Sequence, residues 1–334
     1  MSSGKVLRQL IRAGANGDSG AFRQVSEEVI REERLKQHHL LANDLEQILY
    51  GNTKPLASNS LSRLMPAVPM DKERGLPLLD IRQPQRSLEE LILSRQTLSS
   101  VEELLEEHRR QDVLRTYGLR ASSKVLFFGP PGCGKTLAAE VIACELDLPL
   151  AIVRLDAMVS SFLGETSANL RKVFDFITQY PLVVLFDEFD ALGKERSDSS
   201  EHGELRRVVN AVLQMMDAYQ GNSLMIAATN HEQILDSAVW RRFDDTLEFL
   251  LPNPELLPQI LQLKLRGVRR QFDTDDAEII ELFKNNSPAD VERVVRRAVK
   301  RMILKNQEFL AVKDLVQAKE REMRPANYFE RNDR

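Results

Sequence analysis

One short string constrains the fold of this chain more than any other feature of its sequence. Residues 129–136 read GPPGCGKT, which matches the pattern G-x-x-x-x-G-K-[ST], and the apolar run VLFF stands directly before them. A glycine-rich turn between a buried strand and a helix can point backbone N–H groups at phosphate oxygens. The string therefore predicts a strand, a phosphate-binding loop and a helix that begins near Lys135. A glycine-rich turn with an accidental lysine is the alternative, and the agreement of pattern and context disfavours it.

The residue types in this loop suit a nucleoside triphosphate with its magnesium ion. Lys135 would supply a positive charge near the β- and γ-phosphates, and the Thr136 hydroxyl would be a ligand for Mg²⁺. Cys133 is expected to contribute its backbone, although a thiol near a helix N-terminus can have a lowered pKa. The expected nucleotide-binding residues are Pro131, Gly132, Cys133, Gly134, Lys135, Thr136 and Leu137.

A pair of carboxylates follows about fifty residues later, where the apolar run LVVLF ends in Asp187 and Glu188. Side chains at the carboxyl ends of parallel strands meet at the edge of the sheet where the phosphate loop also lies. Asp187 is expected to hold Mg²⁺ through water, and Glu188 to polarise the water that attacks the γ-phosphate. The alternative is that these two acids form a plain polar turn. The phosphate-binding loop upstream favours the catalytic interpretation over this one. ATP and Mg²⁺ are therefore the expected cofactors.

Short apolar runs alternate with helical patterns through the middle of the chain and begin at Val125, Leu150, Leu182, Leu224 and Leu247. Near-continuous apolar strands separated by helices indicate a parallel sheet that is covered on both faces. We expect an α/β fold, with a doubly wound, five-stranded parallel sheet in a nucleotide-binding domain over residues 88–251. A small helical domain should follow over 252–334, with helices at 255–265, 275–284, 288–304 and 312–323.

The first part of the chain has a different pattern. Apolar residues recur at helical steps from Asp18 to Leu49, which predicts a helical N-terminal region over residues 1–51 that serves partner binding or assembly. Five prolines without a clear period then predict a linker over residues 52–87. Helical patterning returns from Ser87 to Tyr117 and leads into the sheet.

Composition excludes several classes of function. The net charge of -4 and the pI near 5.9 argue against a general affinity for nucleic acid, which needs a basic face. Cys133 and Cys144 are too few for a disulfide framework or a zinc site. Neither a long apolar stretch nor the apolar core of a signal peptide is present. These features predict a cytoplasmic protein without membrane association, for which nucleic acid is a disfavoured partner.

Two further motifs complete a family resemblance. IAATN and LDSAVWRRFDD follow the phosphate loop and LFDEFD in the order and spacing of the AAA ATPases, which the chain resembles from about Leu88 to Met323. The resemblance implies a helical lid after the nucleotide-binding domain and a ring, as a hexamer. It also implies that Asn230 senses the γ-phosphate, with a strand-ending turn residue as the alternative. The SPAD string at 287–290 is similar to the family's S-G-A-D, with Pro288 in place of glycine.

The resemblance assigns arginine fingers to Arg241 and Arg242. An arginine delivered to a neighbouring subunit's ATP stabilises the charge that develops during phosphoryl transfer. The family usually separates its two arginines by other residues, whereas here they are adjacent. Which of the two reaches the neighbour therefore stays open.

A loop after the second expected strand carries the residues Phe162, Leu163 and Gly164, which resemble the family's aromatic–hydrophobic–glycine pore loop. The following helix should begin near Thr166. An aromatic side chain at the ring axis could grip an extended polypeptide through apolar contacts. The alternative is that Phe162 and Leu163 pack in the core.

Three functions compete. The preferred hypothesis is a ring ATPase that remodels or threads a protein partner. The second is an ATP-dependent switch that gates a partner by assembling, without threading. AVWRRFDD and the N-terminal EERLKQHHLLANDLEQIL look like a group of bacterial AAA proteins often encoded beside subtilisin-like proteases, which implies a serine protease partner in phage defence. The third, a nucleic-acid loader or helicase, is disfavoured by the acidic balance.

Overall fold

The computed structural model describes residues 67–72, 74–155, 163–189, 211–235 and 237–322, together with Val25 and Ser26. Residues 1–66 and 67–334 are two compact units, and the second holds every element below. The predicted helical N-terminal region lies outside the described residues, except that Val25 and Ser26 are helical. Most of the predicted linker also lies outside them.

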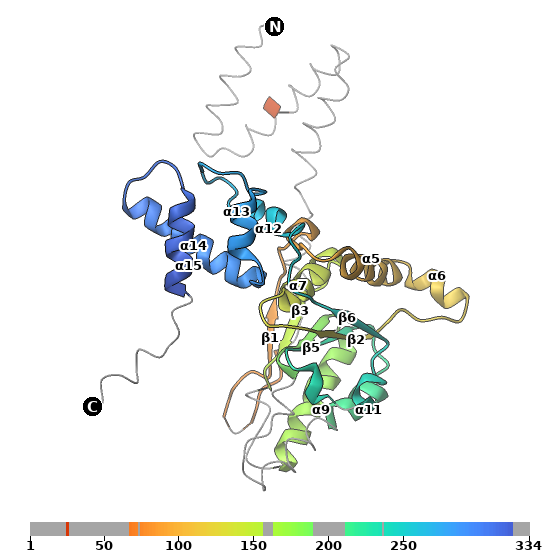
Figure 1. The fold of residues 1–334 in the computed structure, drawn as a ribbon. Helices are drawn as coiled ribbons and strands as arrows, with labels where there is room; N and C mark the ends of the chain where they lie inside the picture. The colour runs from red at the N-terminus through yellow and green to blue at the C-terminus, as the bar shows by residue number, and fades with distance from the viewer. Residues whose placement is uncertain are drawn as a thin grey trace. The chain divides into compact units, whose positions relative to one another are not determined.

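A six-stranded sheet forms the centre of the second unit, with the strand order β1-β3-β4-β5-β2-β6 (Figure 1). The two central strands, β4 and β5, are fully buried and carry almost only apolar side chains, so they appear as continuous apolar runs in the sequence. Strands β2 to β6 are parallel, and β1 pairs antiparallel with β3 at one edge. The strands are β1 (Leu79–Arg82), β2 (Lys124–Phe128), β3 (Leu150–Val153), β4 (Val183–Phe186), β5 (Leu224–Thr229) and β6 (Asp245–Glu248).

The prediction of a five-stranded, wholly parallel sheet missed one antiparallel edge strand and shifted the bounds of the other edge strand. Strand β1 comes from the segment predicted as a linker, between Pro77 and Pro84. An edge strand has only one neighbouring strand and is less buried than an inner strand. The four residues of β1 therefore carry too short an apolar pattern to be distinguished from a proline-rich loop. Strand β6 spans Asp245–Glu248 rather than 247–251, because only Leu247 of its four side chains is buried and the strand has no continuous apolar run.

Helices pack on the sheet and connect its strands. The stretch from Ser87 to Tyr117 contains three elements rather than one helix, because residues 91–94 are not helical and Ser94 caps the next helix by accepting a hydrogen bond from Thr97 N at 3.1 Å. Leu91 packs into the core under the sheet, whereas Ile92 packs against the C-terminal helices. The elements are η1 (Leu88–Glu90), α5 (Arg95–Arg109), α6 (Gln111–Thr116), α7 (Lys135–Glu145), α9 (Leu163–Gln179), η3 (Glu232–Ile234) and α11 (Ser237–Trp240).

A helical region with its own hydrophobic core follows the last strand. Its helices agree with the four predicted ranges to within two residues, and one of them has the predicted bounds. They are α12 (Leu257–Lys264), α13 (Ala277–Phe283), α14 (Pro288–Leu304) and α15 (Val312–Glu322). The separate core explains why these four helices form a body distinct from the sheet. Within the described residues, no helix has the length and apolar character that crossing a bilayer requires.

Candidate active site

Two glycines of the loop between β2 and α7 are required by close contacts. A Cβ atom on Gly129, whose φ is 129°, would lie 2.2 Å from the carbonyl oxygen of Phe249. A Cβ atom on Gly132, whose φ is 76°, would lie 2.7 Å from Ser287 Oγ. A larger residue at position 129 would displace the sheet edge, and one at position 132 would displace the helical region. The glycine pattern read from the sequence thus reflects packing on both sides of the loop.

Lys135 is the first residue of α7, and its side chain is turned back into the loop. The residue is 6% exposed, and Nζ donates to Gly129 O at 2.7 Å and to Pro130 O at 2.8 Å. A buried ammonium group needs such acceptors, because leaving it without them costs several kcal/mol. The loop therefore holds a positive charge at its centre. This is where the sequence places the phosphate-binding charge.

Thr136 and the two carboxylates meet where β4 ends. The Thr136 hydroxyl donates to Asp187 Oδ2 at 2.9 Å, and the backbone N–H of Glu188 donates to Asp187 Oδ1 at 2.9 Å. The backbone of Glu188 has a φ of 50°, which is uncommon outside glycine and costs on the order of 1 kcal/mol. Asp187 is half-buried and Glu188 is exposed. The strained turn thus leaves the Glu188 carboxylate accessible beside Asp187.

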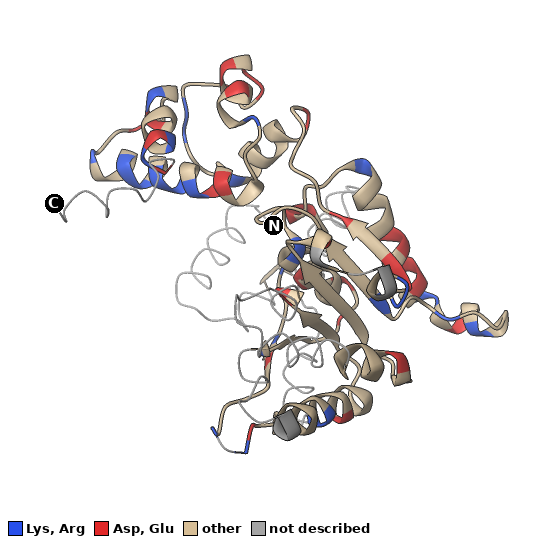
Figure 2. Cartoon of the chain, turned by 60° about the horizontal axis from the view of Figure 1, so that its bottom comes forward, with Lys and Arg blue, Asp and Glu red and all other residues tan. Residues whose placement is uncertain are grey.

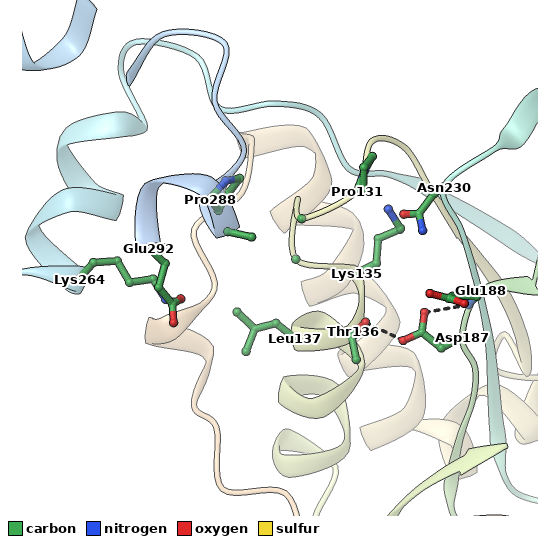
Figure 3. Close-up of a pocket in the computed structure, with 13 residues that line it drawn as sticks. Pro131, Lys135, Thr136, Leu137, Asp187, Glu188, Asn230, Lys264, Pro288 and Glu292 are labelled. Atoms are coloured by element: carbon green, nitrogen blue, oxygen red, sulfur yellow. Dashed lines mark hydrogen bonds and ion pairs between the residues drawn. The ribbon is translucent and has the colours of Figure 1, made fainter. Parts of the chain in front are cut away.

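These residues line one cavity of about 350 Å³ that lies between the loop, the sheet edge and the helical region. Asn230 lies on it directly after β5, so the structure brings the predicted loop, carboxylate and asparagine residues together (Figure 3). Cys133 is not among the residues that line it. The lining residues are Pro131, Gly132, Gly134, Lys135, Thr136, Leu137, Asp187, Glu188, Asn230, Lys264, Pro288, Ala289 and Glu292.

The helical region contributes four of those residues, and sequence reasoning assigned none of them. Pro288 and Ala289 belong to the SPAD string that was noticed, and Ala289 N donates to Gly132 O at 3.1 Å. Lys264 on α12 forms an ion pair with Glu292 on α14 across the cavity from the carboxylates (Figure 3). No motif marks Lys264 or Glu292. Only the packing of two helices against the loop brings them to the site.

A capping box orients the start of α14. Ser287 Oγ accepts from Asp290 N at 3.2 Å and donates to Asp290 Oδ2 at 2.7 Å, and Ser287 N donates to Asp290 Oδ2 at 3.1 Å. Burial acts to raise the pKa of Asp290, but hydrogen bonds from Ser287 and Arg293 outweigh it and hold that pKa below its usual value. Because this helix start touches Gly132, the cap fixes the helical region against the loop.

Cys133 differs from one expectation. Its side chain is 2% exposed, and burial raises the pKa of its thiol although the charge of Lys135 acts to lower it. The lowered pKa that a helix N-terminus can give is therefore absent at this residue. Cys144 is half-buried, and both cysteines are free thiols.

The segment that carries the two arginines is anchored on both sides. Phe243 is 8% exposed and packs edge-on against Phe189, with ring centroids 6.5 Å apart. Asp244 accepts hydrogen bonds from Ser123 N at 2.9 Å and from Lys124 N at 3.0 Å, which fixes the segment to the start of β2. Because Phe189 follows Glu188 directly, this packing connects the arginine segment to the carboxylate turn.

The two arginines differ in their surroundings. Arg242 Nη1 donates to Asp217 Oδ2 in an ion pair, and its side chain is 34% exposed. Arg241 is exposed and has no ion-pair or hydrogen-bond partner within the described residues. Neither arginine lines the cavity of its own chain. The finger role that the resemblance implies for these arginines stays a prediction.

The predicted pore loop is described only in part. Phe162 lies outside the described residues, and helix α9 begins at Leu163, three residues before the predicted start at Thr166. Leu163 and Gly164 thus stand in its first turn. The first N–H groups of a helix need no intrahelical partner, so glycine is tolerated there and the sequence marks the start only weakly. The role of these three residues stays a prediction.

The donor set fits the Mg²⁺ that the sequence predicts. A hydroxyl and one carboxylate, from Thr136 and Asp187, lie in contact at the cavity, and Mg²⁺ prefers oxygen ligands from few protein groups, with the remainder supplied by water and substrate phosphates. Within the described residues, no cluster of three His, Cys, Asp or Glu side chains forms a site that would hold a metal without substrate.

Comparison with known proteins agrees with this geometry. Residues 125–251 match the family described as "ATPase family associated with various cellular activities (AAA)". An uncharacterized AAA family ATPase of Sinorhizobium fredii is 39% identical over 97% of this chain and 96% of its own length. A Methanocaldococcus jannaschii protein named as a 26S proteasome regulatory subunit homolog is 33% identical over 60% of this chain and 55% of its own length. The human ATPase family gene 2 protein homolog A is 34% identical, over 55% of this chain and 21% of its own length. The chain therefore belongs to the AAA ATPase family.

Proposed function

We propose that this chain binds ATP with Mg²⁺ in the cavity between its sheet and its helical region and hydrolyses the β–γ phosphate bond. One observation carries the proposal: a buried lysine, a hydroxyl paired with a carboxylate, an accessible second carboxylate and an amide all line one cavity. These groups match the needs of phosphoryl transfer, in which positioning and charge stabilisation supply most of the catalysis.

Each side chain has one task in this reaction. Lys135 exchanges its carbonyl acceptors for oxygens of the β- and γ-phosphates, and the loop amides and the N-terminus of α7 hold the same phosphates. Thr136 directly and Asp187 through water would hold Mg²⁺, which would neutralise charge on the phosphates. Glu188 accepts a hydrogen bond from the attacking water, and Asn230 positions that water. The water oxygen bonds to the γ-phosphorus while the bond to the bridging oxygen breaks and leaves its electron pair on ADP. One proton of the water passes by way of Glu188 to solvent, and the products are ADP and hydrogen phosphate.

The far end of the cavity suits the nucleoside. Leu137, Pro288 and Ala289 give it apolar walls, whereas Lys264 and Glu292 lie at its rim. A purine ring between apolar side chains and a ribose near polar ones is the usual division of such a site. The base would therefore contact both the α7 side and the α14 side. Binding would draw the helical region, acting as a lid, toward the loop.

Hydrolysis also needs a second copy of the chain in this proposal. Arg241, which has no partner within the described residues, is the arginine delivered to the neighbour's ATP, and the Arg242–Asp217 ion pair holds the segment that presents it. Subunits that each complete the ATP site of the next subunit assemble most simply into a closed ring. We propose a cytoplasmic hexamer.

Remodelling of a protein partner is the activity that this ring would perform. The proteasome regulatory name of one relative and the pore-loop resemblance at Phe162 support it. The alternative is a switch that gates a partner, with a subtilisin-like protease in phage defence as the specific case. The two differ in whether residues 162–164 touch a polypeptide.

The site assignment is tested with two substitutions. Lys135→Ala should abolish ATP binding, whereas Glu188→Gln should keep binding and lose about 10²- to 10⁴-fold in turnover, because the carboxylate acts mainly in the transition state. Nucleotide titration and a phosphate-release assay separate the two effects. Equal loss of binding in both variants would contradict the role given to Glu188.

Threading is tested at Phe162. Phe162→Ala should leave basal hydrolysis within a small factor and remove partner-stimulated hydrolysis, whereas Phe162→Tyr should preserve both because it keeps the ring. Unchanged partner stimulation in the alanine variant would favour the switch. Loss of basal hydrolysis or of folding would identify Phe162 as a core residue.

A further inference from the structure

Two oppositely charged stripes lie on helix faces that take no part in the proposed reaction. The acidic stripe consists of Glu102, Glu103 and Glu106 on the exposed face of α5. The basic stripe consists of Arg293, Arg296, Arg297 and Lys300 on the exposed face of α14, opposite the face that Val291, Val294, Val295 and Ala298 bury. Both stripes follow the three- and four-residue spacing of one helix face.

Two charges of each stripe have no partner within the part of the chain that the structure describes. Within the described residues, Glu102 and Glu103 have no hydrogen-bond or ion-pair partner, and the same holds for Arg296 and Lys300. The other members do have partners: Glu106 pairs with Arg110, Arg293 with Asp290 and Arg297 with Glu322. Each stripe therefore keeps charge available for a contact outside the described part of the chain.

The two stripes lie on opposite sides of the second unit. Helix α5 packs beside the edge strand β6, where Thr97 Oγ1 donates to Glu248 O at 2.8 Å. Figure 1 shows α5, α6 and α11 on the right of the sheet, and Arg241 follows the last residue of α11. Helix α14 extends to the left from the cavity. In Figure 2 red ribbon segments, which mark Asp and Glu, are frequent on the helix to the right of the sheet, and blue segments, which mark Lys and Arg, are frequent along the long helix on the left.

This placement matters for the contact that delivers Arg241. Suppose that the side of one copy that carries α5 presents Arg241 to the cavity of the next copy, on the side that carries α14. The same approach then brings α5 of the first copy toward α14 of the second. The charges then meet with opposite sign. Exposed apolar side chains follow both stripes in the chain: Val113 and Tyr117 are 53% and 79% exposed, and Ile303 and Leu304 are 61% and 84% exposed.

We propose that the acidic stripe of one copy docks on the basic stripe of the next and that this contact selects head-to-tail assembly. The inference rests on the proposed function, because it needs a subunit that supplies Arg241 to its neighbour. The occupant of each stripe is thus a second copy of this chain, since a single chain carries both complementary surfaces on opposite sides. Two copies that approach with the same stripe facing each other repel, because the facing charges have the same sign.

Charge exchange between the stripes tests the proposal in the full-length protein. Glu102→Lys/Glu103→Lys places basic charge opposite the basic stripe, and Arg296→Glu/Lys300→Glu places acidic charge opposite the acidic stripe. With a non-hydrolysable ATP analogue bound, each variant alone should assemble with an apparent Kd raised about tenfold or more, because attraction becomes repulsion. An equimolar mixture should recover wild-type assembly, since alternating copies restore opposite charges at every interface. Sedimentation velocity measures the assembly of each variant alone and of the mixture.

Matched controls use unpaired charges outside the stripes. Glu278→Lys on α13 and Lys313→Glu on α15 change net charge by the same sign per residue, and they should leave assembly unchanged. The wild-type protein should assemble more weakly at high salt, as exposed charge pairs require.

The outcomes that would overturn the inference are separable from failure of the proposed function. Variants that assemble like the wild type, or a mixture that does not recover, would remove the stripe contact while ATP hydrolysis and Arg241 delivery stand. If only Arg296→Glu/Lys300→Glu weakened assembly, the partner of α14 would be something other than α5 of a second copy, such as residues 1–66 or a nucleic acid. This result would also overturn the inference. A wild-type protein that binds the analogue and stays monomeric would overturn the ring itself, and the inference with it.

Discussion

The sheet side and the helical side of the cavity are built in different ways. On the sheet side, Asp187 and Asn230 follow strands whose residues are fully buried, and Lys135 follows a loop whose glycines are fixed by contact. On the helical side, a hydrogen bond from Ala289 N reaches Gly132 O, and a capping box holds the start of α14. In the proposed function, the groups that would perform chemistry are held by the continuous sheet, whereas the groups that would enclose the nucleotide belong to a region with its own hydrophobic core.

Separate hydrophobic cores make that difference possible. The core under the sheet and the core of the helical region share no buried residue, and the chain passes between them through residues 249–256. Opening the helical region would therefore break few contacts in either core. We expect changes on the sheet side to affect turnover most and changes on the helical side to affect nucleotide affinity most.

The largest expected effect is at the arginine segment on the sheet side. Arg241→Ala should lower hydrolysis by the assembled protein on the order of 10³-fold and leave ATP binding close to wild type, because an arginine supplied in trans acts on the transition state. Arg242→Ala should cost less, since this side chain is held by Asp217. Mixing Arg241→Ala with Lys135→Ala subunits should recover part of the activity. A larger loss in Arg242→Ala would reverse the assignment of the two arginines.

A substitution at the contact between the two sides should act on affinity. Gly132→Ala places a Cβ atom 2.7 Å from Ser287 Oγ and should weaken nucleotide binding about tenfold or more, because the helical region must shift. Gly267→Ala is the matched control: its φ of 79° is close to the 76° of Gly132, and nothing lies within 4 Å of its added Cβ. Titration with a fluorescent ATP analogue measures both. Equal weakening in the two variants would show that backbone strain alone is responsible.

Loss of the α14 cap should have a smaller effect. Ser287→Ala removes the acceptor of Asp290 N and should lower the stability of the helical region by about 1 kcal/mol. Hydrogen exchange should become faster in α14 and stay slow in β4 and β5. Ser94→Ala removes the equivalent cap of α5 and should leave α14 exchange and nucleotide affinity unchanged. Faster exchange across the sheet in Ser287→Ala would contradict two separately stable bodies.

The smallest expected effect reports on the loop itself. Because burial raises the pKa of the Cys133 thiol, little thiolate is present at neutral pH, and alkylation should be slower at Cys133 than at Cys144. Raising the pH through the ordinary thiol range should increase the rate, since the thiolate fraction rises. A Cys144→Ser protein leaves one thiol to follow by mass spectrometry. Rapid modification of Cys133 at neutral pH would show that the loop is open to solvent.

Much of the sheet side could be predicted from the sequence. The loop at 129–136 and the strand ends at Asp187 and Asn230 are local patterns, and parallel strands place their carboxyl ends at one edge without further information. The residues of the helical side could not be predicted in the same way. Lys264 and Glu292 lie 28 positions apart and belong to different helices, so no spacing rule relates them.

The sequence by itself determined where the phosphates and the hydrolysis carboxylates should lie, because those groups depend on strand and turn geometry within a few residues. Tertiary structure alone decided the added edge strand β1, the ion pair at the cavity rim and the availability of Arg241 beside a paired Arg242. It also placed α5 and α14 on opposite sides of the unit formed by residues 67–334. Each of these depends on which elements pack together, and packing between distant segments leaves no periodic signal in the chain.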